Sequence, residues 1–352
     1  MHASTVAIDL AKEVFELAFA DDRGRVVERK RLSRRAFARA LEQRPPLRVL
    51  MEACGSAHYW ARRFQRLGHA VRLLPARDVR PYVRGNKTDR NDVAGILEAD
   101  RCGNIAGVPV KTPEQQGIQA LHRLREHLKA ERTATINLLR GVLREFGVTI
   151  PAGALKVPAA VRDALEDGDN ELPMPLRYSL DDQLQRLAQL QADMAAIEQR
   201  LEEFADRDVA VQRYRRVPGV GLLTATALRA SAGDLSRFRN GRQFAAWLGL
   251  TPREHSSGQQ RRLGGLTKRG DVYLRTLLVH GARAVLTAAR LKQRRGQPLD
   301  PLQAWALKVQ DARGHNKAAC ALANKLARRL WAMEHHGQAF DPRHVSQRPG
   351  AH

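Results

Sequence analysis

The hydrophobic periodicity of the chain changes near residue 110, and this change limits the folds that the chain can adopt. Before that point, short apolar runs have the length of β-strands and are separated by turn or helix signals. The strand runs are 4–9, 13–20, a third that begins at Val26, 47–51 and 70–74, with helices expected at 33–41 and 57–67. After that point, apolar residues recur every three or four positions, which is the period of an α-helix. We therefore expect a mixed α/β sheet domain followed by helical domains.

Two long helical patterns follow, one from Pro113 to about Phe146 and one over 184–204. The apolar residues of the second approximate a heptad seam: Leu184, Leu187, Leu190, Met194, Ile197, Leu201 and Phe204. Such a seam favours a coiled coil or a dimer stalk, although an amphipathic helix packed within one chain gives the same pattern. Prolines and glycines between 151 and 175 indicate a linker. We predict four segments, 1–110, 111–208, 209–337 and a flexible tail 338–352.

The net charge of +23 points to a polyanionic partner, most often nucleic acid, and it is unevenly distributed. Residues 1–156 hold 29 basic and 17 acidic side chains, and residues 209–352 hold 26 basic and 7 acidic ones. Between them lies an acidic segment, residues 157–208, with 5 basic and 13 acidic side chains. No apolar run approaches the roughly eighteen residues of a membrane span, and no signal-peptide pattern is present, so we expect no membrane association. The three cysteines stand far apart, which argues against disulfides or a zinc site and fits a reducing cytoplasm.

Four acidic residues occupy positions that nuclease sheets of the ribonuclease H type use to bind metal ions. Asp9 lies in the first strand and Glu52 ends the fourth, while Asp89 and Asp92 have the i, i+3 spacing of one helix face. Two divalent metals about 4 Å apart need several carboxylates that converge from different elements. Each residue alone also has a structural explanation, as a strand-end, rim or first-turn acid, but the set together favours a metal site.

A glycine-rich turn at 217–221 precedes a helical run at 222–232. Its glycines, Gly219 and Gly221, let backbone N–H groups approach a phosphate, and the helix N-terminus favours an anion. Three arginines lie just before the turn: Arg213, Arg215 and Arg216. The pattern resembles a helix-hairpin-helix, which contacts DNA backbones without reading sequence, and a tight connection between two packed helices explains it as well.

The densest group of reactive side chains lies in a basic, glycine-rich loop at 253–271. Ser256 and Ser257 precede Gly258, and a serine that attacks a phosphodiester needs an exposed backbone, a base or metal, and cations. His255 is a candidate base, and the candidate cations are Arg261, Arg262, Lys268 and Arg269. Chemistry alone does not separate a nucleophilic serine from a turn that donates a hydrogen bond to phosphate.

Together these motifs resemble those of the DEDD transposases of the insertion-sequence one-hundred-ten type, the bridge-RNA-guided recombinases, and most closely its eleven-eleven subgroup. The shared motifs are AIDLAK with Asp9, MEACG with Glu52, NKTDRNDV with Asp89 and Asp92, VPGVG, and SSG with LTKRGD. All occur in the family's order, and the resemblance runs from Val6 to about Met333.

The resemblance implies a fold and a mechanism. Residues 1–110 would form a RuvC-like, ribonuclease H-like α/β domain, 111–208 a helical linker and coiled-coil region, and 209–337 a mainly α transposase domain with the helix-hairpin-helix-like turn. The four acids of the DEDD name match Asp9, Glu52, Asp89 and Asp92, as ligands of Mg²⁺ or Mn²⁺. Ser257 would be the nucleophile that forms a phosphoserine link to DNA, with Ser256 as the lesser candidate.

The resemblance also implies the partners. These are DNA of the element ends and target, a guide RNA encoded by the element, and further copies of the chain in a dimer or tetramer, in the bacterial cytoplasm at the nucleoid. Basic residues near the acids would hold RNA or DNA backbones: Arg72, Arg77, Arg80, Arg84 and Lys87. Two other functions stay open, a metal-dependent RuvC-like nuclease or junction resolvase whose serine loop only binds phosphate, and a non-catalytic architectural DNA-binding protein.

Overall fold

A computed structural model of the chain describes residues 3–86, 88–258 and 260–343. It divides the chain into two compact units, Met1–Glu114 and Gln115–His352. The predicted tail lies outside the described residues from 344 onward, and the finer boundary at residue 208 stays a prediction. In the part of the chain that is described, no helix is long and apolar enough to cross a membrane.

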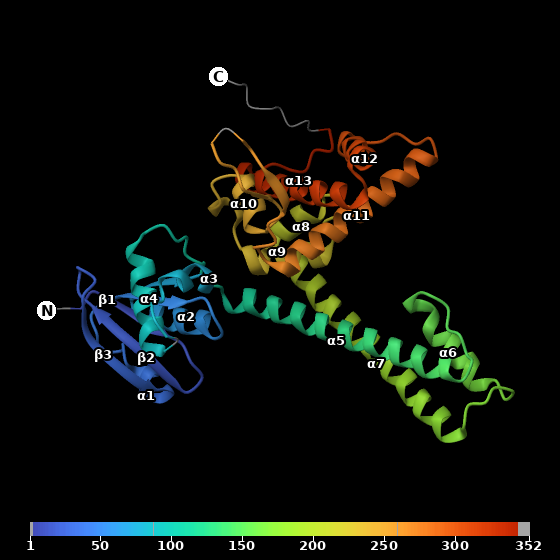
Figure 1. Cartoon of the computed structure of the whole chain (residues 1–352), viewed down its shortest axis with the longest axis horizontal. Coiled ribbons are helices and arrows are strands. Elements are labelled where there is room, and N and C mark those ends of the chain that lie inside the picture. Colours follow the sequence, from blue (N-terminus) through green and yellow to red (C-terminus); the bar gives the residue numbers. More distant parts are fainter. Residues whose placement is uncertain (1–2, 87, 259, 344–352) are drawn as a thin grey trace. The chain divides into compact units, whose positions relative to one another are not determined.

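The first unit contains a five-stranded mixed sheet, as the sequence predicts (Figure 1). Its strands are β1 (Thr5–Asp9), β2 (Val14–Ala20), β3 (Val26–Ser33), β4 (Arg48–Glu52) and β5 (Ala70–Leu74), in the spatial order β3-β2-β1-β4-β5. β1 pairs antiparallel with β2 and parallel with β4, and β4 pairs parallel with β5. The carboxyl ends of β1 and β4 therefore meet at the same edge of the sheet.

Helices cover both faces of this sheet, because strand side chains alternate between its two sides. On one side, α1 (Arg34–Arg39) and α2 (Ala57–Arg66) bury an aromatic cluster of Phe15, Phe37, Trp60 and Phe64. On the other, α4 (Asp89–Arg101) packs on Ala7, Ala18, Leu50 and Leu74, after the short α3 (Ala76–Val79) and the 3-10 turn η1 (Arg80–Tyr82). Asp9 ends β1 two positions after Ala7, and Glu52 ends β4 two positions after Leu50. Both acids therefore share the α4 face.

In the second unit, the long helices α5 (Pro113–Glu145) and α7 (Met174–Ala205) run side by side and antiparallel (Figure 1). Ion pairs join Arg125 to Glu198 at 2.6 Å and Arg186 to Glu131 at 3.3 Å. The predicted seam of α7 is at most 8% exposed along 184–204, where it packs on α5 and on the short helix α6 (Val157–Glu166). The seam is thus covered by the same chain, as in an amphipathic helix packed within a monomer, and neither a coiled coil nor a dimer stalk is confirmed.

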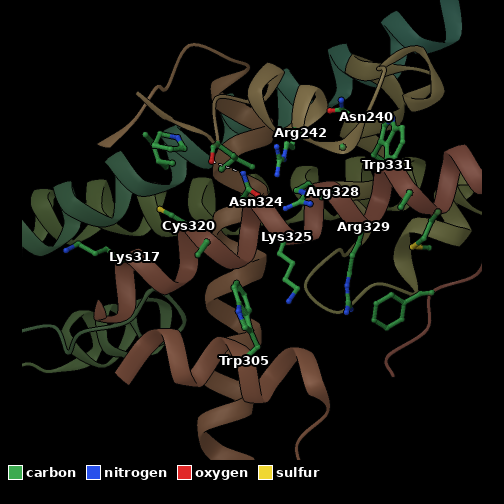
Figure 2. Close-up of a pocket in the computed structure, with 18 of the residues that line it drawn as sticks. Asn240, Arg242, Trp305, Lys317, Cys320, Asn324, Lys325, Arg328, Arg329 and Trp331 are labelled. Atoms are coloured by element: carbon green, nitrogen blue, oxygen red, sulfur yellow. Dashed lines mark hydrogen bonds between the residues drawn. The ribbon is translucent and has the colours of Figure 1, made fainter. Parts of the chain in front are cut away.

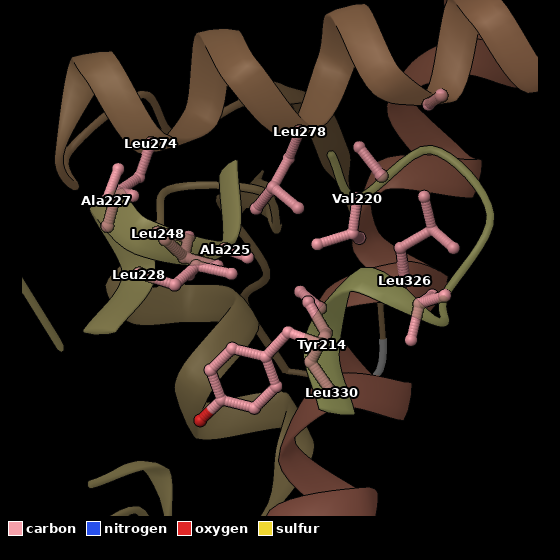
Figure 3. Packing of buried hydrophobic residues seen from close by; sticks show 14 of the residues in the cluster. Tyr214, Val220, Ala225, Ala227, Leu228, Leu248, Leu274, Leu278, Leu326 and Leu330 are labelled. Atoms are coloured by element: carbon pink, nitrogen blue, oxygen red, sulfur yellow. The ribbon is translucent and has the colours of Figure 1, made fainter. Parts of the chain in front are cut away.

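The rest of the second unit is a helical bundle around α13 (His315–His336), which packs on α10 (Gly241–Trp247), α11 (Val272–Arg294) and α12 (Pro301–Arg313). α8 (Val209–Arg215) and α9 (Leu222–Ala232) pack on each other and close the core, where Tyr214, Leu278 and Leu330 meet (Figure 3). A two-stranded antiparallel ribbon, β6 (Pro252–Glu254) and β7 (Leu263–Leu266), leaves the bundle between α10 and α11. Single 3-10 turns lie at η2 (Ala154–Lys156) and η3 (Leu235–Arg237).

Candidate active site

Three of the four predicted acidic residues come together where β1 ends against the first turn of α4. Carboxylate oxygens of Asp9, Asp89 and Asp92 all lie within 4.8 Å of one another. Helix α4 begins at Asp89 because Thr88 caps it, its hydroxyl accepting a hydrogen bond from the Asn91 amide at 3.3 Å. The i, i+3 spacing then places Asp92 on the same face as Asp89.

Burial and mutual repulsion disturb the ionisation of this cluster. Burial is the largest cause of a raised pKa at Asp9, which reaches about 6. The charges of Asp92, Asp89 and Glu16 add to the rise, in that order. Glu52 lies outside the group of three, yet burial and then the charges of Asp9 and Asp92 raise its pKa as well. Glu52 therefore interacts electrostatically with the cluster.

Glu16 is a further acidic residue at this site, and the sequence motifs do not predict it. It lies directly opposite Asp9 in the β1–β2 register, so the two side chains emerge on the same face of the sheet. The strand-like alternation at 13–20 is visible in the sequence, but the register that sets Glu16 beside Asp9 is not.

The donor set of the cluster fits a divalent metal ion. Mg²⁺ and Mn²⁺ prefer hard oxygen ligands, and carboxylates from two elements converge here. A bound cation would also neutralise the like charges that raise the pKa of Asp9. Asp9, Asp89 and Asp92 are the residues that would hold such an ion, with Glu52 beside them.

A cavity of about 470 Å³ next to the acidic cluster carries positive charge. Four cations and two acids are among its lining residues, which are Glu16 of β2, Arg29, Lys30 and Arg31 of β3, Thr88, and Asp89 and Arg90 of α4. The Nη1 atom of Arg29 is buried and has no hydrogen-bond partner among the described residues. Cations beside metal-binding carboxylates suit a nucleic-acid phosphate. The basic run at 29–31 is the sequence signal for this cavity, and the motifs do not include it.

Two of the arginines expected to hold nucleic acid near the acids form ion pairs within the first unit, one of them buried in part and the other exposed. Arg72 bonds to the buried carboxylate of Asp100 and to the carbonyl oxygen of Ile105. Arg77 forms an exposed ion pair with Asp78 at 3.1 Å. Arg80 and Arg84 are exposed, and Lys87 lies outside the described residues. A basic residue near a site in sequence is therefore not sufficient evidence of contact with a ligand.

The two serines of the basic loop differ in their hydrogen bonds. The Ser256 hydroxyl donates to Glu254 Oε1 at 2.8 Å and accepts from the Arg262 amide at 3.2 Å. Ser257 is exposed at the end of the ribbon and pairs through its backbone with Gln260. Its hydroxyl has no hydrogen bond to any residue that the structure describes. Ser257 is thus the serine whose hydroxyl is available to a substrate.

The four predicted cations of this loop are all exposed and lie along the ribbon and before α11. Arg261 forms an ion pair with Glu254 at 3.3 Å, and Arg262 donates to the side chain of Gln260 at 3.3 Å. Lys268 has a left-handed φ of 55°, and Arg269 follows it. This loop therefore presents exposed positive charge on the segment that carries Ser257.

The glycine turn at 217–221 joins α8 to α9 and packs tightly against α11. Gly219 has a φ of +82°, and a Cβ there would lie 2.7 Å from the carbonyl oxygen of Gly281. Gly221 is exposed and precedes α9 as its N-cap. Arg215 is paired with Glu202. The other two arginines before the turn lie at or near the surface: Arg213 and Arg216. Close packing accounts for Gly219 without a ligand, so a helix-hairpin-helix is not confirmed.

Substitution of Gly281 tests this packing. A Cβ at Gly281 would lie 1.8 Å from the Gly219 carbonyl oxygen, so we expect Gly281→Ala to lower the free energy of unfolding by about 3 kcal/mol. Gly141→Ala in α5 is the control, because nothing lies within 4 Å of its Cβ and alanine favours a helix by about 1 kcal/mol. Urea unfolding measures the free energy of unfolding of both variants. An unchanged value for Gly281→Ala would show that the turn does not need this contact.

Comparison with known proteins identifies the family of the chain. Residues 211–296 match a model described as the transposase IS116/IS110/IS902 family, and residues 6–148 match a transposase model of the DEDD type of IS110. The chain is 44% identical to a probable family 20 transposase of Pseudomonas aeruginosa, over 95% of this chain and 97% of the relative. The chain belongs to the IS110/IS116/IS902 family of DEDD transposases.

Two further relatives of this transposase are named for insertion sequences. It is 38% identical to the transposase for insertion sequence element IS1111A of Coxiella burnetii, over 93% of this chain and 88% of the relative. It is 36% identical to the transposase for insertion sequence element IS1328 of Yersinia enterocolitica, over 96% and 99%. The predicted family is thus confirmed. Its relatives include an IS1111A transposase, in agreement with the predicted eleven-eleven subgroup.

Membership of this family makes the chain an enzyme of DNA transposition. It binds DNA, cleaves it and rejoins it. The DEDD type also indicates dependence on a divalent metal, in agreement with the acidic cluster. The region matched at residues 6–148 contains the four acidic residues, and the region matched at residues 211–296 contains the glycine turn and Ser257. The acidic cluster and the serine ribbon belong to different compact units.

Proposed function

We propose that this transposase cuts and rejoins DNA through a covalent phosphoserine link at Ser257. The contrast between the two serines carries this proposal, because Ser256 is hydrogen-bonded within the ribbon whereas the Ser257 hydroxyl is exposed. Arg261 and Arg262 flank it and can stabilise the charge that develops on the phosphoryl oxygens.

The proposed step is a transesterification. The Ser257 oxygen forms a bond to phosphorus, and the bond between phosphorus and one deoxyribose oxygen breaks. The hydroxyl proton ends on the released deoxyribose oxygen, so the step needs no external oxidant, reductant or nucleotide. Attack by the hydroxyl of another strand reverses the step and rejoins DNA, because the covalent link conserves the phosphodiester energy.

The acidic cluster would be the metal centre of a RuvC-like domain. Its support is the sheet order β3-β2-β1-β4-β5, which places Asp9 at the end of the central strand, and the convergence of Asp89 and Asp92 on it. A bound divalent ion supplies Lewis-acid stabilisation of the phosphoryl oxygens. The carboxylates would hold that ion, and the neighbouring Arg29 and Arg31 would orient the phosphate.

An RNA guide and an oligomer complete the proposal. The resemblance of the motifs supports an element-encoded RNA that pairs with donor and target DNA, so that base pairing reads sequence while the protein holds backbones by charge. The acidic site of one subunit would serve the serine of another in a dimer or tetramer.

A trapping assay tests the proposal. The full chain is incubated with donor DNA, RNA transcribed from the noncoding flank of the element, and Mg²⁺, and then denatured. We expect a protein–DNA adduct on a denaturing gel in Mg²⁺, and none in EDTA. Cleaved DNA without an adduct would overturn the serine link in favour of the nuclease alternative. Full adduct formation without the RNA would overturn the guide.

A further inference from the structure

A long basic groove lies in the second unit, with a volume of about 1310 Å³ (Figure 2). Residues of α10, β7, α12 and α13 and of the segment after α13 line it. Six cationic side chains share this lining: Arg242, Lys268, Lys317, Lys325, Arg328 and Arg329. The lining includes one acidic residue among the described residues, Asp341, which leaves a strong excess of positive charge.

Acidic residues offset only part of the positive charge of the groove within the described residues, where Asp300 and Asp341 act on Arg329. Arg242, Lys317, Lys325 and Arg328 form no ion pair with a described acidic residue. Burial, followed by the charges of Arg329 and Arg328, lowers the pKa of Lys325. An anion in the groove would relieve this repulsion.

Two tryptophans line the groove together with these cations. Trp305 of α12 lies under Lys325, whose Nζ is 4.1 Å from the ring centroid. Trp331 of α13 is fixed by a hydrogen bond that its Nε1 donates to the Phe238 carbonyl at 2.9 Å. Cations that follow a backbone and rings on which bases stack are the two elements of single-strand recognition. A duplex is read by an element that protrudes into it, whereas this surface is concave.

The groove is continuous with the serine ribbon. Gly264, Gly265 and Leu266 of β7 line it, followed by Lys268. The same strand pairs with β6, and the turn between them carries Ser257. A strand seated in the groove therefore leaves it along the ribbon whose turn bears the exposed hydroxyl.

We propose that this groove binds an unpaired DNA strand that adjoins the phosphodiester attacked by Ser257. The assignment of that strand as DNA rests on the proposed function of Ser257, while the groove itself recognises a single-stranded polyanion with stacking bases. Strand exchange between DNA molecules requires such a strand to be held while it is unpaired.

Binding measurements without catalysis test the groove. The probe is a fluorescein-labelled twelve-nucleotide DNA strand, bound by the full chain carrying Ser257→Ala in EDTA and followed by anisotropy. Arg242→Gln with Arg328→Gln, both exposed positions, should weaken binding at least about tenfold. It should also reduce the slope of log affinity against log salt by about 1.4. Trp305→Leu should weaken binding about five- to a hundredfold and leave that slope unchanged.

The control removes the same charge elsewhere. Arg162→Gln with Arg200→Gln changes two exposed arginines of the acidic segment, and we expect affinity within about twofold of the parent. Unchanged binding in the Arg242/Arg328 pair would overturn the groove. Tighter binding of duplex DNA or of an RNA strand that depends on the same residues would overturn the DNA-strand assignment. These affinities do not depend on formation of the covalent adduct. A failure of the proposed serine mechanism is therefore distinguishable from a failure of the proposed groove.

Discussion

Ser257→Ala should lower formation of the covalent protein–DNA adduct by about 10³-fold or more, because it removes the proposed nucleophile. Ser257 makes no side-chain hydrogen bond to a described residue, so the fold loses little, and RNA and DNA binding should stay near the parent values. The measurement is the adduct yield on a denaturing gel, with mass spectrometry of the digested adduct to locate the modified serine.

Ser256→Ala is the matched control for this prediction. It removes a hydrogen bond to Glu254 and one from the Arg262 amide, and both bonds are exposed to water, which competes for the same groups. Adduct yield should therefore fall by less than about tenfold. An adduct that persists in Ser257→Ala and disappears in Ser256→Ala would reassign the nucleophile.

Four strands of the first unit could be predicted because each is a short apolar run bounded by turn signals. The predicted strands coincide closely with β1, β2, β4 and β5, since burial of one or both faces leaves a clear pattern in these segments. β3 has no buried residue, and the sequence predicts only its start at Val26. Pairing is different, because register depends on two segments at once. Glu16 became part of the site only through its position opposite Asp9, and Arg29 through the cavity that β3 and α4 share.

The period of the apolar residues at 184–204 does not predict which surface packs against them. The spacing at 184–204 requires an apolar partner, and α5 of the same chain meets that requirement as well as a second copy would. Likewise, two adjacent serines have the same chemistry in the sequence, where only the family resemblance ranks Ser257 first. The hydrogen bonds of Ser256 add a structural difference between them. The basic groove combines Arg242, Trp305 and Arg328 from three helices, which no local motif connects.

Asp9→Asn should abolish cleavage and yet stabilise the metal-free protein. The carboxylate is one of three whose oxygens lie within 4.8 Å of one another, so its loss removes a metal ligand and should reduce adduct yield by about 10³-fold or more. The same change removes a charge that burial disfavours and that Asp92 and Asp89 repel. Because the side chain is only about half buried, we expect a gain of roughly 1 kcal/mol in EDTA at neutral pH, measured by thermal unfolding.

The pH dependence separates the cost of the ionised Asp9 carboxylate, which arises from burial first and from the neighbouring acids second, from other effects of the substitution. The pKa of Asp9 rises from 3.8 to about 6 in the folded chain, so the folded state holds the proton more tightly than the unfolded state, and stability falls as pH rises from about 4 to about 6. Asparagine does not ionise, so the advantage of the variant is present above about pH 6 and disappears below about pH 4. Mg²⁺ at neutral pH should narrow the gap, because a bound cation neutralises the same charges. Asp22→Asn in the β2–β3 turn, an exposed position, should show neither effect. An equal advantage of Asp9→Asn at both ends of the pH range would contradict the cost of the ionised Asp9 carboxylate as the cause.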